Sequence, residues 1–476
     1  MNSQRDNSRL LYCDKSVKMP TKFSKFVIDA TCKEYVHPWT DSCISATAGL
    51  GLHAIQECLR IYTTVYLVTM VMRGKRPTKN EIKKMLMGIL QSTAFLSWST
   101  FTFSMFLCSF RRLTGNFNAL SVAFLPSFFS SLSAIVIERP SRRTMLCLYV
   151  SNIATETLFK MGLWRGYYRS IPYGNVYIFA ASMATLLYLY RNSDGNNDAI
   201  FRIIKFVASP YEAKNHIQSQ IGDRADRRDG QSDRVEHSIS KSNILMETLR
   251  AYHRLTKWIK SFGKHCRCPH PHSCANFVLG GGSKLFGIGL TVQIGLKLIV
   301  QLKTLLRKPY LLKPMIFQKK NIDLAIFLGG FTVIYRFVSC TLRRFNDGDN
   351  PIHALPAGLL AGLTFVMFPN NTIALYVMWK SLQLFWNKGI ENGTLPKIKG
   401  FVIVLYCFST AVLFHAAMVE PQNLRASYFK FLHSLSGGRL ATMNRIPLDQ
   451  FGLETSKYLE QVLIKTNTTN KLIFSF

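Results

Sequence analysis

Cysteine and histidine gather at two places in the sequence, and their side chains are the best candidates for chemistry. The first set is Cys32, His37 and Cys43. The second set occupies residues 265–274 and consists of His265, Cys266, Cys268, His270, His272 and Cys274. Thiolate and imidazole groups at such short spacing suit a tetrahedral zinc ion. The candidate metal ligands are Cys32, His37, Cys43, Cys266, Cys268, His270 and Cys274.

Other interpretations of these two sets stay open. Neither set has the ligand spacing of a known zinc finger, so disulfides, lipidated cysteines beside a membrane and free thiols are alternatives. The two sets could also join into one site, which would require both to lie on one side of a membrane. Five further cysteines lie inside apolar stretches and are expected to pack in the core; these are Cys58, Cys108, Cys147, Cys340 and Cys407.

Charged and polar side chains inside apolar stretches form a second group of candidates. They are Glu57, Arg60, Glu156, Lys160 and His415. A charge at membrane depth costs several kcal/mol unless it is paired or hydrated. Because Glu57 and Arg60 are three residues apart, and Glu156 and Lys160 four, each pair can form on one helix face. We interpret them as structural pairs and interfacial ends, with a proton or substrate path as the alternative.

Motifs of the common enzyme classes are missing from the sequence. It contains no phosphate-binding glycine loop, no convincing Ser-His-Asp arrangement and no paired carboxylates. We therefore expect that the protein is not an enzyme and has no established cofactor, zinc being the one candidate.

Long apolar stretches must position these side chains. The chain has 476 residues, 48% of them hydrophobic. The apolar residues come in blocks, several of which reach or approach the roughly 20 residues that a helix needs to cross a bilayer. The pattern predicts an all-α, multi-pass transmembrane bundle. The blocks are residues 44–72, 85–110, 117–137, 144–164, 176–190, 277–302, 322–342, 352–368, 372–386 and 401–419.

Basic residues dominate the charge balance. Lys and Arg number 59 against 26 Asp and Glu, which gives a net charge of +33. They cluster at the ends of the apolar blocks, as in Arg73–Arg76 and Arg139–Arg143. This placement is typical of loops that face the cytosol or matrix and contact anionic lipid. We therefore expect membrane lipids, and not nucleic acid, as partners.

The two halves of the sequence resemble each other. Arg111-Arg112 is followed by Leu125-Pro126, as Arg343-Arg344 is followed by Leu355-Pro356, with similar gaps. These matches predict two related repeats of four to five helices each. Five spans per repeat would make the halves inverted relative to each other, and four would make them parallel. The helix after Pro356 carries a small-xxx-small pattern that predicts close helix packing, at Gly358, Ala361 and Gly362.

Changes in composition divide the chain into six segments. The stretch around Glu212–Arg234 has too few apolar residues to order itself. Lys241–Phe262 is predicted to form a short basic amphipathic helix, which either lies on a membrane surface or is a solvated helix within the linker. The predicted segments are a polar leader at 1–43, a first membrane repeat at 44–190, a largely disordered basic linker at 191–264, a Cys/His element at 265–276, a second membrane repeat at 277–419 and a polar tail at 420–476.

Several motifs resemble the transmembrane protein 135 family. They are His37-Pro38, Glu57-Cys58-Leu59-Arg60-Ile61-Tyr62, Asn152-Ile153-Ala154-Thr155-Glu156, Phe414-His415-Ala416-Ala417 and Met443-Asn444-Arg445. Ala426 stands where the family usually has Pro in its Leu-Arg-Pro-Ser-Tyr motif. Residues 330–362, with Arg344 and Asp347, are also similar to the inner-membrane translocase channel family.

The resemblance to the first family implies a location and a role. Its members are multi-pass proteins of peroxisomal and mitochondrial membranes, tied to peroxisome organisation, the mitochondrial fusion–fission balance and lipid metabolism. The resemblance implies that this protein promotes fission through a dynamin-related GTPase as partner. A transporter or channel for a lipid or small metabolite is the alternative. The family supplies no catalytic residues to carry over.

Overall fold

The computed structural model describes residues 26–72, 74, 77–192, 198–212, 268–270, 273–307, 310 and 318–469. These residues form two compact units, of which unit 1 comprises Met1–Ser170 with Ile398–Phe476 and unit 2 comprises Ile171–Lys397. Each unit therefore differs from the segments 44–190 and 277–419 that the sequence predicts. Most of the predicted linker, including Lys241–Phe262, lies outside the described residues.

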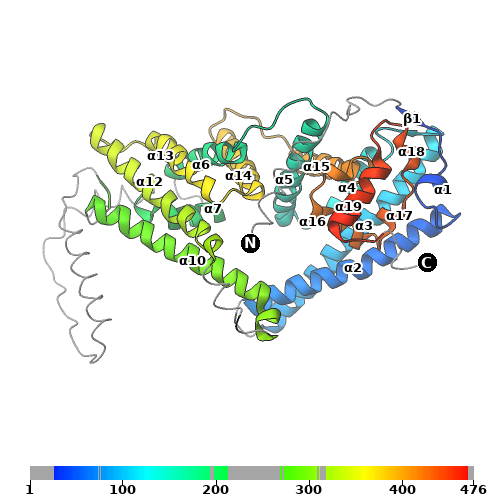
Figure 1. Cartoon of the computed structure of the whole chain (residues 1–476), viewed down its shortest axis with the longest axis horizontal. Coiled ribbons are helices and arrows are strands. Elements are labelled where there is room, and N and C mark those ends of the chain that lie inside the picture. The colour runs from blue at the N-terminus through cyan, green and yellow to red at the C-terminus, as the bar shows by residue number, and fades with distance from the viewer. Residues whose placement is uncertain are drawn as a thin grey trace. The chain divides into compact units, whose positions relative to one another are not determined.

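Unit 1 is built on two long helices and a late helix of the chain. Its elements before residue 170 are β1 (Val27–Ile28), α1 (Cys32–Tyr35), α2 (Cys43–Met72), α3 (Lys79–Thr114), β2 (Phe117–Asn118), α4 (Phe124–Ile135) and α5 (Pro140–Trp164). Helix α2 packs on α3, and β1 pairs antiparallel with β2. Helix α15 (Phe401–Val419) joins them from far along the sequence and packs against α4 and α5 (Figure 1).

Helix α3 has strong local signals at both ends. Thr78 and Glu81 form a capping box at its start, in which each side chain accepts a hydrogen bond from the other residue's backbone N–H. Gly115 ends the helix in the left-handed conformation, with φ at 75°. Arg111 and Arg112 occupy the last turn, where the helix dipole favours positive charge. These signals fix the end of α3 next to β2.

The C-terminal residues of unit 1 are folded, which differs from the polar tail expected from residue 420 onward. They form η6 (Pro421–Asn423), α16 (Ala426–Leu435), α17 (Arg439–Thr442), α18 (Ile446–Asp449) and α19 (Thr455–Thr466). Phe429, Phe451 and Leu453 are buried here. Helix α16 contacts α2, and α19 contacts η6. Short amphipathic helices carry few apolar residues each, so composition alone missed this layer of the core.

Unit 2 pairs helices from both halves of the sequence in the same manner. Its elements are α6 (Gly174–Arg191), α7 (Ala199–Ala208), η1 (Pro210–Glu212), α10 (Cys274–Arg307), η3 (Lys319–Asn321), α12 (Asp323–Phe345), η4 (Pro351–His353), α13 (Ala354–Gly362), η5 (Leu363–Met367) and α14 (Asn371–Glu391). Helix α10 packs on α12. Helix α6, from the first half of the sequence, packs against α13 and α14.

Four of the described helices are long and apolar enough to cross a membrane. They contain Lys79–Thr114, Cys274–Ile299, Asp323–Phe345 and Phe401–Val419. The blocks 117–137 and 352–368 instead give the short apolar helices Phe124–Ile135 and Pro351–Met367. A helix of 12 residues such as α4 is about 18 Å long, which is less than the roughly 30 Å of a hydrocarbon core. The all-α membrane character is thus confirmed, whereas the two repeats of four to five helices stay a prediction.

Helix α13 approaches α6 through glycine. A Cβ atom placed on Gly362 would lie 2.4 Å from the Cα of Ala180, and one on Gly358 would lie 2.7 Å from the Cα of Ala184. Ala361, between them on the same face, is fully buried. Only hydrogen fits at the two glycines, because the obstacle is backbone that cannot swing away.

Substituting Gly362 tests this contact. We expect Gly362→Val to lower the free energy of unfolding by about 1–3 kcal/mol, because the added carbons overpack the α6–α13 interface. The measurement is thermal unfolding of the purified protein in detergent. Gly287→Ala on α10 is the control, since no described atom lies within 4 Å of its added Cβ. Equal stability of the two variants would contradict the close approach.

Candidate metal centres and buried ion pairs

The first Cys/His set gathers in unit 1 and gains a fourth member. Cys32 begins α1, His37 follows that helix, and Cys43 begins α2. Cys108, near the end of α3, completes the group. One ligand atom from each of the four residues lies within 4.8 Å of the other three. These four residues, Cys32, His37, Cys43 and Cys108, form the first quartet, which joins the segment before α2 to both long helices.

Hydrogen bonding orients the imidazole of His37. Its Nδ1 lies 2.8 Å from the carbonyl oxygen of Thr40, and because a carbonyl only accepts, Nδ1 carries the proton. In the neutral ring, Nε2 then has a free lone pair. Nε2 lies 3.2 Å from the Sγ of Cys43. This is the arrangement that a metal-binding histidine needs, with the distal nitrogen fixed by a backbone carbonyl.

Arg111 holds the segment that carries Cys32. It lies one turn beyond Cys108 on α3, and its Nε donates to the carbonyl oxygen of Ala30 at 2.6 Å. Its guanidinium also pairs with Asp29 at 3.3 Å. These contacts fix the approach to α1, whose start is capped by Thr31 and Glu34.

The second Cys/His set gathers in unit 2 in the same way. Cys268 and His270 precede α10, Cys274 begins it, and Cys340 lies on α12. Their ligand atoms again lie within 4.8 Å of one another. The Sγ atoms of Cys268 and Cys274 are 3.8 Å apart, and the Sγ of Cys340 is 3.6 Å from the Nε2 of His270. The His270 ring also stacks on Phe277 at 4.4 Å.

The two distances in the second quartet fit tetrahedral zinc. With bonds of about 2.3 Å to sulfur and about 2.0 Å to nitrogen, a tetrahedron places two sulfurs about 3.8 Å apart and a sulfur about 3.5 Å from a nitrogen. In the first quartet, the Nε2 of His37 lies closer to the Sγ of Cys43, at 3.2 Å. Hydrogen bonding by Cys108 lowers the pKa of the Cys32 thiol to about 6, and hydrogen bonding by Cys340 lowers that of Cys268 to about 4. The same hydrogen bonds raise the pKa of the Cys108 and Cys340 thiols, so one thiol of each quartet is favoured as thiolate. Thiolate is the form that binds metal. None of the nine described cysteines forms a disulfide.

The structure thus places the predicted ligands in two groups and adds one to each. His265, Cys266 and His272 lie outside the described residues. Cys108 and Cys340 were expected to pack in the core, and Cys340 does lie in a buried cluster. The sequence pattern did not place either of them beside the two Cys/His sets, where the structure has them. The sequence does carry a signal, because each precedes a matched Arg-Arg pair by three residues.

Buried ion pairs surround the second quartet. Arg343, one turn beyond Cys340, is fully buried and donates to both carboxylate oxygens of Glu212 at 2.9 and 2.6 Å. It also donates to Asp349 at 2.8 Å, and Arg191 pairs with the same aspartate. Burial raises the pKa of Glu212, but the charges of Arg343 and Arg191 outweigh burial and lower it overall. Two arginines and two carboxylates thus neutralise one another.

The charged residues expected at membrane depth lie in unit 1 and have partners. Glu57 accepts from Arg60 at 2.6 Å and from the Ser434 hydroxyl. Glu156 accepts from Lys160 at 2.7 Å and from Arg425 at the start of α16. These contacts tie α2 and α5 to the C-terminal helices.

His415 differs from these charged residues. It lies half-buried on α15 with its ring 6.5 Å from that of Phe124. Its Nδ1 is buried and has no hydrogen-bond partner among the described residues. Packing against an aromatic ring accounts for its position, and the structure brings no other candidate residue to it.

Four of the described helices are long and apolar enough to span a bilayer, and this fits an integral membrane protein. Residues 29–163 match the family model described as the N-terminal cysteine-rich region of Transmembrane protein 135. This match, over the first part of the chain, supports the resemblance to the transmembrane protein 135 family that the sequence motifs predicted. No solved structure matches the chain. The likeness of residues 330–362 to the translocase channel family stays a prediction.

Metal analysis tests the two quartets. We expect the purified full-length protein to hold two zinc ions per chain, and Cys108→Ser and Cys340→Ser each to remove one, because serine is a poor zinc ligand. Cys147→Ser is the control, since Cys147 is buried in the core of unit 1 and belongs to neither quartet. Full zinc content in both ligand variants would contradict the assignment.

Loss of Arg343 tests the buried ion pairs. Arg343→Met leaves Glu212 buried without its main partner, which costs about 3–5 kcal/mol. We expect a large fall in the unfolding temperature in detergent. Arg344→Met is the matched control, because Arg344 is the exposed neighbour on the same helix turn and its loss is expected to cost little. An equal effect of the two substitutions would show that the pairs contribute nothing.

Proposed function

We propose that this chain is a non-catalytic, multi-pass protein of peroxisomal and mitochondrial membranes that organises these membranes and promotes their fission through a dynamin-related GTPase. Two structural zinc ions hold its helix pairs together. The architectural part of this proposal rests on one observation, the two Cys3His quartets, of which each unit contains one. The organelle, the fission role and the link to lipid metabolism rest on the family.

The composition of the quartets supports a structural role for the metal. Catalytic zinc keeps one coordination position for water or substrate, whereas structural zinc has four protein ligands. Each quartet here supplies four, drawn from a segment before a long helix, the first residue of that helix and the next long helix. Binding would therefore crosslink α2 with α3 and α10 with α12. Zinc bound in this way contributes its binding free energy to folding.

The ion pairs favour this architectural role over transport. A proton or ion path needs charged groups that can exchange partners. Glu57 and Glu156, which motivated the transport alternative, are each held by a cation on their own helix and by a C-terminal side chain. Pairs of this kind stabilise helix contacts, and they keep both carboxylates bound to fixed partners instead of available to a transported ion.

We infer that the two halves of the chain arose by duplication. Supporting this, Cys43 and Cys274 each begin a long helix, and Cys108 and Cys340 each lie on the next. Near the ends of α5 and α14, Gly162 and Gly389 make room for the side chains six residues later, Tyr168 and Leu395. Tyr173 and Gly400, which precede α6 and α15, both have positive φ, at 58° and 80°.

The duplicated halves would then have exchanged their last helices. Helix α6 packs on α13 and α14 of the second half, and α15 packs on α4 and α5 of the first. Such an exchange makes the fold of each unit depend on both halves of the sequence. It also gives a membrane-organising protein a single cooperative scaffold.

Rescue of cells that lack the protein tests the proposed function. We expect the wild-type chain to restore the number of peroxisomes, the length of mitochondria and recruitment of the fission GTPase. The doubly substituted chain Cys108→Ser, Cys340→Ser would fail, because both crosslinks are lost. Cys147→Ser with Cys407→Ser is the control with the same number of buried thiols removed outside the quartets. Rescue by the zinc-site variant at equal protein level would overturn the proposal.

Reconstitution separates this proposal from the transport alternative. Purified protein in liposomes is expected to show no flux of small ions or metabolites that Glu156→Gln reduces. A saturable flux that this variant lowers, with the protein still folded, would favour a transporter. Zinc content measured on the same sample confirms that the scaffold is intact.

A further inference from the structure

A basic groove lies in unit 2, next to His270 of the second quartet. It is formed by α7, η1, the first turns of α10 and one residue of α12. Its volume is about 600 Å³, which is in the range of small-molecule sites. None of the described residues that line the groove is acidic, and four of them are cations, namely Arg202, Lys205, Lys284 and Arg336.

The positive charge of this groove is not neutralised by the residues that the structure describes. The ion pairs of unit 2 all join other side chains. Two acids of the same segment are bound elsewhere, since Asp198 pairs with Lys380 at 2.8 Å and Glu212 pairs with Arg343 at 2.6 Å. Cations that share a groove repel one another, so the groove favours an anion as its ligand.

Arg336 of α12 is fixed in the groove by carbonyl groups of two other helices. Its Nε donates to the carbonyl oxygen of Ala208 at 3.1 Å, and its Nη1 donates to that of Phe277 at 2.8 Å. A longer bond, of 3.5 Å, joins its Nη2 to the carbonyl oxygen of Val207. A guanidinium has five N–H donors, and these bonds use three of them. Arg336 can therefore donate to a ligand while it keeps its contacts with the protein.

Two glycines of α10 leave room for this arginine and for a ligand. A Cβ atom on Gly281 would collide with the guanidinium of Arg336. Gly280 is exposed in the groove, and the nearest atom to a Cβ placed there would be the Oδ1 of Asn276, at 3.9 Å. Glycine within a helix is destabilising relative to alanine. The approach of Arg336 explains Gly281, whereas Gly280 leaves the wall of the groove open.

Apolar side chains are exposed beside the cations. On α7, Ile203 and Phe206 are 59% and 50% exposed, and Arg202 and Lys205 are exposed next to them. The Nζ of Lys284 lies 5.4 Å from the centroid of the Phe206 ring. Basic and apolar side chains exposed together on a short helix suit a membrane interface. Helices α10 and α12 are both long and apolar enough to cross a bilayer, so a lipid head group can reach the groove from the membrane.

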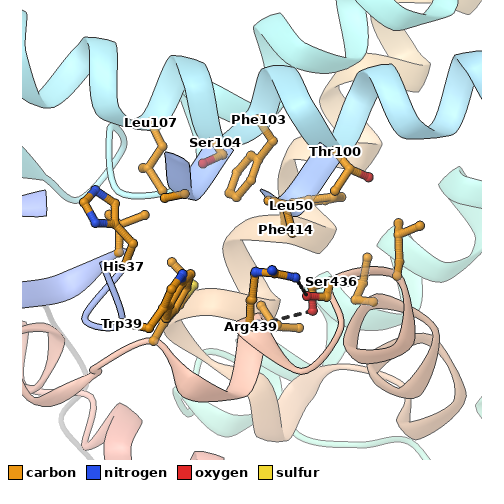
Figure 2. A pocket seen from close by; sticks show the side chains of 16 residues that line it. His37, Trp39, Leu50, Thr100, Phe103, Ser104, Leu107, Phe414, Ser436 and Arg439 are labelled. Atoms are coloured by element: carbon orange, nitrogen blue, oxygen red, sulfur yellow. Dashed lines mark hydrogen bonds between the residues drawn. The ribbon is translucent and has the colours of Figure 1, made fainter. Parts of the chain in front are cut away.

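The apolar pocket beside the first quartet differs from this groove. Figure 2 shows Leu50, Phe103 and Arg439 around it. Its volume is only about 70 Å³, less than half of the roughly 150 Å³ of an engineered cavity that binds benzene. It has no room for a lipid, whereas the groove of unit 2 does.

We propose that the basic groove of unit 2 binds the phosphate of an anionic phospholipid, whose oxygens accept hydrogen bonds from Lys205, Lys284 and Arg336. The acyl chains leave the groove past Phe206 and lie along α10. Phosphate accepts several charge-assisted hydrogen bonds, and basic pockets between spanning helices suit anionic head groups. The inference goes beyond the proposed function and rests only on the membrane-spanning character of α10 and α12.

Binding to the purified full-length protein in non-ionic detergent tests the proposal. The probe is radiolabelled dioctanoyl phosphatidic acid. The competitors are dioctanoylglycerol, which has the chains without the phosphate, and inorganic phosphate, which has no chains. We expect saturable binding at one site that dioctanoylglycerol does not displace. Inorganic phosphate is expected to displace the lipid only at a far higher concentration, because it gains nothing from the apolar surface.

Two matched pairs of lysine substitutions separate the groove from net charge. Lys205→Gln combined with Lys284→Gln removes two of its four cations and is expected to weaken binding about tenfold or more. Lys320→Gln combined with Lys397→Gln removes two exposed lysines of unit 2 that lie outside the groove. This control loses the same charge and is expected to bind the lipid as the wild type does.

A glycine substitution separates binding from folding. Gly280→Leu places a side chain in the groove and is expected to abolish binding. It should not lower the unfolding temperature, because leucine favours a helix more than glycine does. Gly287→Leu is the control on the same helix, since no described atom lies within 4 Å of a Cβ placed on Gly287, and it is expected to leave binding unchanged.

Four results would overturn the proposal. They are no saturable binding of phosphatidic acid, equal displacement by dioctanoylglycerol, displacement by inorganic phosphate as effective as by the lipid itself, and equal weakening by both lysine pairs. The third would assign the groove to a free anion, and the fourth would reduce its effect to net charge. None of the four depends on organelle shape, fission or zinc content, so they are distinguishable from failure of the proposed function.

Discussion

Three thiols and an imidazole crowd within 4.8 Å at one end of each long-helix pair. Thiolates so close repel one another, and a divalent cation at their centre converts that repulsion into four bonds. With metal bound as proposed, much of each unit would depend on this interaction. In unit 1, Cys43 lies on α2 and Cys108 lies on α3. Closing the long stretch of chain between these two residues costs entropy, and metal binding would offset that cost. The same holds for Cys274 and Cys340 in unit 2.

Charge neutralisation extends from the quartets into the rest of the protein. Arg111 and Arg343 lie one turn beyond the helical cysteines, and both hold acidic residues of preceding segments, Asp29 and Glu212. In unit 1, Arg165 pairs with the fully buried Glu420 at the end of α15. Glu212 and Glu420 are fully buried, so their pairs carry a desolvation cost, and each carboxylate fixes the position of the arginine that donates to it.

The sequence alone predicted the helical membrane character, because apolar blocks and their basic flanks report it directly. The sequence also identified most of the cysteines and histidines of the two quartets as candidate metal ligands. It could not connect Cys108 with Cys43, because the two are joined only through the packing of α2 on α3. The sequence also did not show that α6 packs on α13 and α14, or that α15 packs on α4 and α5. Apolar helices of similar composition carry no sequence feature that identifies their packing partners. Phe429 and Phe451 are buried in helices too short and too polar to stand out.

The zinc coordination shell is the most direct test of this account. X-ray absorption at the zinc edge of the purified full-length protein reports the number and type of ligand atoms. The account predicts three sulfurs at about 2.3 Å and one nitrogen at about 2.0 Å per zinc, averaged over the two sites. A shell dominated by oxygen, or one with two or fewer sulfurs, would contradict it.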